Sequence, residues 1–279
     1  MIRQIVWKEW HEHRSKYIGY WLTLYAPIVL LSLAIALTTG ARTPFADLSD
    51  ASVLKYLPLS LGQGFFVLTI FLVLTGYLAV AMFSPEIEDR SLFFLYELGV
   101  PRKKYFLIKL LYGAGHVMLA TFTSILLLPA VAYTMMLIGG KVTTAGSGAA
   151  FALVMSVAAR AGVWCALISL AAFTASALIA ALVPRWWIAA LCSVVVTLAF
   201  VGWGEDYFTY LPDMPNDSMS ISFNVSTNSS QWINISRAFK PAELNAMAQW
   251  WTGPLIATVL LIAVFAATST WFYDRREMR

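Results

Sequence analysis

Charged residues are scarce in this chain. Aspartate, glutamate, lysine and arginine make up 12% of the 279 residues, whereas 59% are hydrophobic. A soluble globular domain carries about twice that charged share, so the composition indicates a membrane protein. Several apolar runs reach the roughly 20 residues that an α-helix needs to cross a bilayer, and they lack the ten-residue alternation of a β-barrel. We therefore predict an all-α polytopic membrane protein.

Cysteine and histidine are also rare, which bears on redox and metal chemistry. The two cysteines, Cys165 and Cys192, both fall in predicted membrane spans, and the three histidines show no metal-ligand spacing. We expect neither a disulfide nor a metal site. The net charge of +4 is interpreted as positive loops on one side of a membrane, so we expect no nucleic-acid partner.

The chain also lacks the motifs of a catalytic or energy-converting site. The only glycine–lysine run, Gly139–Val142, has neither the spacing nor the hydroxyl of a phosphate-binding loop. No nucleophile–base pair is apparent, and no pair of acids lies within a predicted span. We therefore expect no catalytic residue and no cofactor in this chain.

Six apolar segments are predicted to cross the membrane. They cover residues 18–37, 60–83, 106–138, 151–183, 186–203 and 253–273. Thirteen lysines and arginines then lie on one side and five on the other, with Arg160 left over. The positive-inside rule places both termini, the 84–109 segment and the 184–185 turn in the cytoplasm. We predict a multi-pass membrane protein.

The first 17 residues precede the predicted six-span membrane domain, 18–279, and show a helical pattern. One face is expected to carry Ile2, Ile5, Val6, Trp10, His13 and Tyr17. The other positions are expected to carry Arg3, Lys8, Glu9, Glu12 and Lys16. Tryptophans and basic residues beside a membrane span favour a helix that lies in the interface. The alternative is a plain positive leader.

Residues 204–252 form the longest predicted external segment. Residues 219–225 and 231–236 alternate apolar with polar side chains around a polar turn, which predicts a small β-hairpin. Residues 241–251 begin with Pro241 and predict a short helix that lies on the membrane or dips into it.

The segment from Ser84 to Lys109 is the one long charged stretch between apolar spans. Its acids follow Pro85, an apolar run then ends near Leu98, and a basic cluster follows Pro101. Acids after a proline suit a helix start, and glycine then proline suit its end. We predict an amphipathic helix at the membrane surface. The alternative is a solvated loop whose positive charge only sets topology.

This combination resembles the ABC-2 family of ATP-binding-cassette transporter permeases. The resemblance rests on Trp7–Trp10 in an interfacial helix, on six spans, and most specifically on Pro85–Arg90 and Leu95–Tyr105. In residues it is specific only around 85–109, and Asp89 and Arg90 stand where many members have a small residue and threonine. The resemblance covers the whole chain in architecture.

The resemblance implies a subunit of an exporter in a bacterial inner membrane, which other proteins drive. A second permease subunit, identical or paralogous, and two cytosolic ATPases that carry ATP and magnesium would complete it. The implied coupling helix covers 86–98, with the residues Glu86, Glu88, Asp89, Arg90, Leu92, Phe93, Leu95 and Tyr96. The implied external gate consists of Glu243, Leu244, Met247, Trp250 and Trp251. Nothing in the sequence indicates the cargo.

Two other functions stay open. A stand-alone secondary transporter or channel would need ionisable groups inside the membrane, for which His116 and Arg160 are the candidates. A lone histidine in a span is more often a packing residue, and Arg160 is expected near the outer interface, with Glu205 and Asp206 as partners. A membrane sensor or anchor would instead use the external hairpin as its binding surface.

Overall fold

The computed structural model describes residues 2–40, 71–85, 101–138, 144–183, 185–209 and 252–275. The described residues form six helices, listed here with their bounds: α1 (Ile2–Gly40), the Phe71–Pro85 helix, α4 (Arg102–Ile138), α5 (Thr144–Leu182), α6 (Trp186–Thr209) and α8 (Thr252–Arg275). No strand occurs within these ranges. The all-α prediction is confirmed for this part of the chain.

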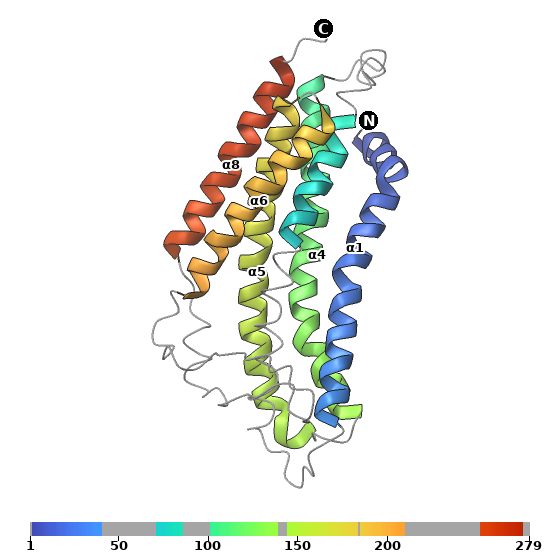
Figure 1. The fold of residues 1–279 in the computed structure, drawn as a ribbon, viewed down its shortest axis with the longest axis vertical. Helices are drawn as coiled ribbons and strands as arrows, with labels where there is room; N and C mark the ends of the chain where they lie inside the picture. The colour runs from blue at the N-terminus through green and yellow to red at the C-terminus, as the bar shows by residue number, and fades with distance from the viewer. Residues whose placement is uncertain are drawn as a thin grey trace, which may run out of the picture.

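Helix α5 is the centre of the bundle. It packs against α4, α6 and α8, while α1 packs on the other side of α4 (Figure 1). Many of its buried positions are small: Ala171, Ala172, Ala175, Ser176, Ala177 and Ala180. Small side chains let helix backbones approach closely, which is how helices associate in an apolar solvent.

Within the described part of the chain, three helices are long and apolar enough to cross a membrane. They are α4 over Arg102–Thr134, α5 over Phe151–Leu182 and α8 over Leu255–Arg275, and the Phe71–Pro85 and Trp186–Phe200 helices are shorter apolar ones. These helices are those expected of a membrane-embedded protein. The remaining predicted spans, 18–37, 60–83 and 186–203, stay predictions.

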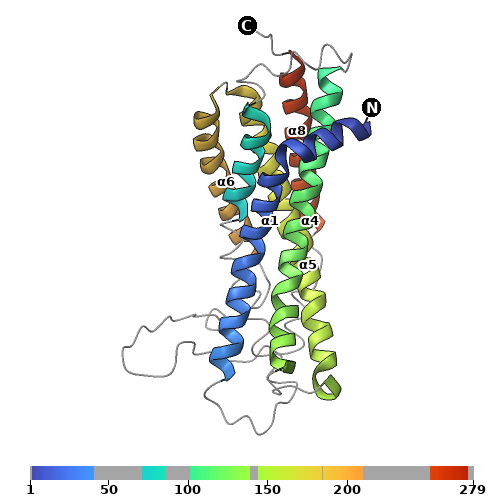
Figure 2. The same ribbon diagram turned by 90° about the vertical axis from the view of Figure 1, so that its right-hand side faces the viewer.

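Six helix ends gather at one end of the bundle (Figures 1 and 2). They are the starts of α1, α4 and α6 and the ends of the Phe71–Pro85 helix, α5 and α8. The charge count grouped the same segments on one side of the membrane. Helices α1, α4 and α5 run further from this end than α6 and α8 do (Figure 1). At about 1.5 Å per residue, the 39 residues of α5 span about 58 Å.

Some boundaries differ from the sequence prediction. Helix α5 begins at Thr144, seven residues before the predicted span 151–183, and α4 continues through Pro129. Membrane helices tolerate proline because neighbouring groups satisfy the freed backbone carbonyl. The first turns of α5 hold two glycines among their alanines, so propensity alone does not favour them. Phe151 stacks on Tyr133 of α4 at 4.1 Å, and such packing between helices supports the longer α5.

Several predicted features lie outside the described residues. These are the coupling segment 86–98 with all eight of its predicted residues, the hairpin at 219–236, and the five predicted gate residues between 243 and 251. The interfacial helix and the two flanks of the coupling segment are described, and the candidate site is built from them.

A buried charge cluster between α1 and α4

The first turns of α1 lie across the axis of the bundle, and the helix then turns to run along it (Figure 2). We call residues 2–17 the α1 arm. The arm was predicted as a separate interfacial helix, whereas the structure has one continuous helix from Ile2 to Gly40. The side chains buried on the inner face of the arm are Ile5, Glu9, His13 and Tyr17, which are spaced four residues apart.

The apolar face predicted from the sequence includes the buried Ile5, His13 and Tyr17 but not the buried Glu9. Glu9 was assigned to the polar face, yet its side chain is 0% exposed, while Trp10 is 38% exposed. A carboxylate is buried only where a cation and hydrogen-bond donors compensate for lost water. Here the compensation comes from α4, more than 90 residues further along the chain.

Glu9 is the centre of this cluster. Its Oε2 lies 3.3 Å from Lys109 Nζ, and its Oε1 accepts a hydrogen bond from the Tyr105 hydroxyl at 2.6 Å. The His13 ring completes the group, because its Nε2 lies 3.3 Å from Lys109 Nζ and 3.7 Å from Glu9 Oε2. The side chains of Glu9, Tyr105 and Lys109 are fully buried. We call these four residues the charge cluster.

Helix geometry brings the four side chains together. Glu9 and His13 are four residues apart on α1, and Tyr105 and Lys109 are four residues apart on α4, so each pair lies on one face. The first turn of α4 is set by Pro101, whose carbonyl accepts bonds from the backbone N–H groups of Lys104 and Tyr105 at 2.9 and 3.1 Å. The cluster therefore sits within the first turns after the predicted coupling segment.

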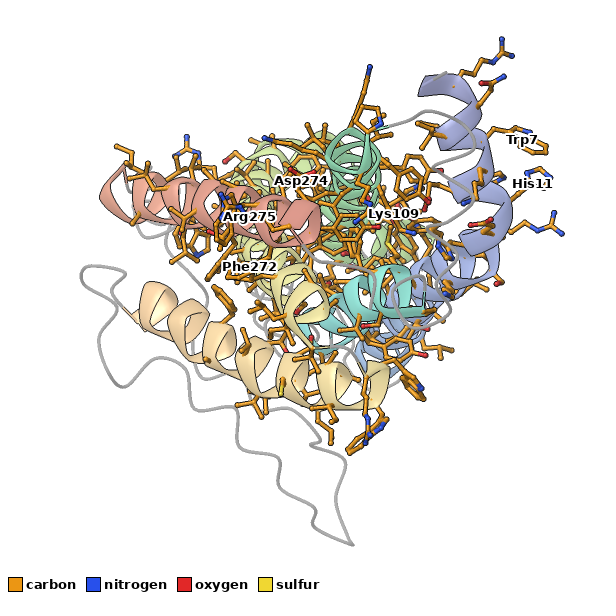
Figure 3. All side chains as sticks on the ribbon, turned by 90° about the horizontal axis from the view of Figure 1, so that it is seen from above. Trp7, His11, Lys109, Phe272, Asp274 and Arg275 are labelled. Carbon is orange, nitrogen blue, oxygen red and sulfur yellow. The ribbon has the colours of Figure 1, made fainter. Side chains whose placement is uncertain are left out.

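The charge cluster also touches the helix that precedes the coupling segment. Lys109 Nζ lies 5.7 Å from the ring centre of Phe83 and 5.8 Å from that of Tyr105. Ammonium groups are attracted to ring faces at such distances. Figure 3, viewed along the bundle from this end, shows Lys109 in the interior of the bundle, on the side of α1 opposite Trp7.

Burial sets the protonation state of His13. Desolvation lowers the pKa of His13 to about 3, and the positive charges of Lys109, Lys16 and Lys8 lower it as well. The imidazole is therefore neutral near pH 7, and its Nε2 can accept a hydrogen bond from the Lys109 ammonium. The cluster thus holds one carboxylate, one ammonium and a neutral ring.

Three side chains of the α1 arm are of the types that ligate metal ions. Glu9, Glu12 and His13 offer ligand atoms that lie within 4.8 Å of one another. The Lys109 ammonium, however, lies 3.3 Å from both Glu9 Oε2 and His13 Nε2, where a shared metal ion would have to stand. A cation there would be repelled by the ammonium, so we interpret the group as an ion-pair cluster.

Further polar contacts tie α1 to the Phe71–Pro85 helix. Lys16 Nζ donates to the Ala81 carbonyl at 2.6 Å, and the Tyr17 hydroxyl donates to Met82 Sδ at 3.3 Å. One turn deeper, the hydroxyls of Tyr20 and Thr75 are 2.8 Å apart. Helix α1 is therefore bonded to both helices that border residues 86–100.

The two titratable residues predicted inside spans take different places. His116 is packed among rings: it stacks on Tyr17 at 4.3 Å, meets the edge of Tyr112 at 4.8 Å, and accepts a hydrogen bond from Trp21 Nε1 at 3.4 Å. This favours the packing interpretation of His116. Arg160 is partly buried on α5, and the side chains of its predicted partners lie outside the described residues.

Glu9, Tyr105 and Lys109 were not identified as site residues from the sequence. The usable signal was the spacing of four that links Ile5, Glu9, His13 and Tyr17, together with the same spacing between Tyr105 and Lys109. Comparison of the chain with family models, with curated proteins and with solved structures gives no match.

Proposed function

We propose that this chain is the permease subunit of an ABC-2 type transporter, most simply an exporter of a bacterial inner membrane. Separate cytosolic ATPases would move it through the segment 86–98, and a second permease subunit would complete the pathway. The observation that carries this proposal is the charge cluster, which joins the α1 arm to the first turns of α4. The residues that contact a partner would lie immediately before those turns.

The charge cluster gives the coupling segment a mechanical consequence. Residues 86–100 connect Pro85 to the start of α4, and both flanking helices are bonded to α1 by buried polar contacts. Separating a buried ion pair strands an uncompensated charge, so the three elements should move as one body. A push on the segment would then reach α1 as well as α4, as a rigid-body switch between two states requires.

The test uses Phe93, in the middle of the predicted coupling helix, and an ATPase encoded beside this chain. Full-length Phe93→Asp and the control Phe93→Leu are expressed with that ATPase, and co-purification and phosphate release are measured in proteoliposomes. We expect Phe93→Asp to lose the partner and the stimulation of ATP hydrolysis, because a buried contact cannot accept a carboxylate. Phe93→Leu should keep both. Retention of both by Phe93→Asp would refute the assignment.

A second candidate is a proton-coupled secondary transporter. The observation that favours it is the charge cluster itself, which places Glu9, His13 and Lys109 in the bundle as buried titratable groups. It predicts that the chain alone, in liposomes with a pH gradient, conducts protons and that Glu9→Gln abolishes the flux. Proton flux without any ATPase would favour this function over the first.

A further inference from the structure

The outer face of the α1 arm, opposite the charge cluster, carries arginine and tryptophan at helical spacing. Arg3, Trp7, Trp10 and Arg14 follow one another at intervals of four, three and four residues, and all are exposed. The Trp10 ring also lies 6.5 Å from that of Tyr17 and 6.3 Å from that of His116, so Trp10 borders the contact between α1 and α4. Trp7 is 63% exposed, and its ring stacks on His11 at 4.0 Å. Figure 3 shows Trp7 and His11 pointing away from the bundle. We call these positions the outer stripe.

The outer stripe continues into an apolar surface further along α1. Ile18, Leu22 and Val29 follow on the same side and are 48%, 63% and 46% exposed. Along this face the residue type changes from arginine with tryptophan to aliphatic side chains. That order matches one leaflet of a bilayer, in which basic groups meet headgroups, tryptophan lies at the interface and aliphatic chains meet lipid tails.

Two other helices also carry arginine and exposed tryptophan near this end of the bundle. Helix α6 begins with exposed Trp186 and Trp187 directly after exposed Arg185. Near the end of α8, the Arg275 guanidinium lies 4.4 Å from the ring centre of exposed Trp271. These helices run along the bundle axis, whereas the α1 arm lies across the axis (Figure 2). The arm therefore presents several turns at the level of the headgroups.

The charge of the outer stripe is positive. The carboxylate of Glu9 is buried against Lys109 on the opposite face. The exposed acid of the arm, Glu12, lies 3.6 Å from Lys8 Nζ. The two arginines of the stripe are therefore not neutralised by the acids of their own arm, and a negatively charged ligand is the complementary partner.

We propose that the outer stripe binds the phosphate headgroups of anionic phospholipids, with Arg3 and Arg14 as headgroup ligands and Trp7 and Trp10 at the interface. A lipid is favoured over a protein partner because the stripe runs without interruption into the lipid-like apolar face of α1. The proposal does not depend on the transport function. Such lipid would hold the arm across the bundle and so brace the charge cluster from outside.

The test measures lipid binding to the full chain by native mass spectrometry. The purified protein is titrated with phosphatidylglycerol and with phosphatidylcholine, and apparent dissociation constants are compared. One basic residue near an anionic surface changes affinity about fivefold, so Arg3→Gln with Arg14→Gln should weaken phosphatidylglycerol binding roughly 25-fold. The matched control, Lys103→Gln with Lys104→Gln, removes two exposed charges from the same end, on α4 and not on the α1 arm, and should weaken phosphatidylglycerol binding less than the arginine pair does.

A charge-preserving variant separates headgroup binding from damage to the arm. Arg3→Lys with Arg14→Lys should keep the preference for phosphatidylglycerol to within about fivefold, because the phosphate contact is chiefly electrostatic. If Arg3→Gln with Arg14→Gln and the lysine control weakened phosphatidylglycerol binding equally, the proposal would be overturned, because binding would then depend only on general positive charge. An unchanged preference for phosphatidylglycerol in Arg3→Gln with Arg14→Gln would overturn it too. So would a co-purifying protein that this variant loses while its lipid binding stays unchanged.

Discussion

The ion pair between Glu9 and Lys109 allows the sharpest test of the structure. Glu9→Gln removes the negative charge with almost no change in shape, and Lys109→Met removes the positive charge while keeping a long apolar side chain. The double variant removes both charges together. Glu12→Gln is the matched control, because it is the same substitution one turn away on a carboxylate that is 44% exposed.

The expected magnitudes follow from burial. Both partners of the Glu9–Lys109 pair are 0% exposed, and removing one partner of a buried pair typically costs about 3–5 kcal/mol, because the other charge stays buried. Glu9→Gln also replaces the charged acceptor of the 2.6 Å bond from Tyr105, and a bond to a charged group contributes about 1.5–3 kcal/mol within that total. The double variant should cost much less than the sum of the two single variants. Glu12→Gln should cost less than about 1 kcal/mol.

The measurement is the free energy of unfolding in mixed micelles, obtained by titration with sodium dodecyl sulfate and followed by helical circular dichroism. The four values form a double-mutant cycle, which isolates the pairwise term. If Glu9→Gln destabilised the protein no more than Glu12→Gln, the burial of Glu9 would be wrong. If the double variant cost the full sum of the single ones, the two residues would not form a pair.

Two further predictions concern the packing of the bundle and its pH dependence. A methyl group on Gly76 would meet Ser193 Oγ at 2.5 Å and Thr197 Cγ2 at 2.6 Å, so Gly76→Ala should lower the free energy of unfolding by about 1–3 kcal/mol. The control Gly115→Ala, with nothing within 4 Å of the added methyl group, should be neutral or stabilising by up to about 1 kcal/mol. Equal effects of the two substitutions in the same unfolding assay would contradict the packing around Gly76. The pKa of His13 falls from 6.5 to about 3 on folding, so the unfolded chain binds its proton first as pH drops. The stability due to the neutral ring is therefore complete above pH 6.5 and is lost by up to about 1.4 kcal/mol per pH unit below it. His13→Asn should flatten the profile between pH 7.5 and 5, and parallel profiles for the two proteins would refute the buried neutral ring.

The positions of the helices could be predicted from the sequence alone. The segments 106–138, 151–183, 186–203 and 253–273 coincide closely with α4, α5, α6 and α8. This succeeded because a helix in an apolar solvent satisfies its own backbone, so a long apolar run is sufficient local information. The grouping of helix ends at one end of the bundle follows from the same alternation of spans.

The place of individual polar residues could not be predicted in this way. Gly76 leaves room for Ser193 and Thr197 of α6, and the sequence around Gly76 does not show that α6 packs there. Which face of a helix lies inward depends on the side chains that neighbouring helices place against it. A pattern of apolar residues is therefore a good guide to Tyr17 and a poor one to a charged neighbour.

What the amino-acid sequence determined by itself was the class of the molecule, the approximate positions of its helices, and an amphipathic first segment with arginine and tryptophan. What only the tertiary structure decided was that Glu9 lies inside. A carboxylate at that position is equally compatible with water, and its burial becomes favourable only when Lys109 and Tyr105 of another helix supply the opposite charge and the hydrogen bond. That compensation is a property of two helices in contact, so no local stretch of sequence contains it.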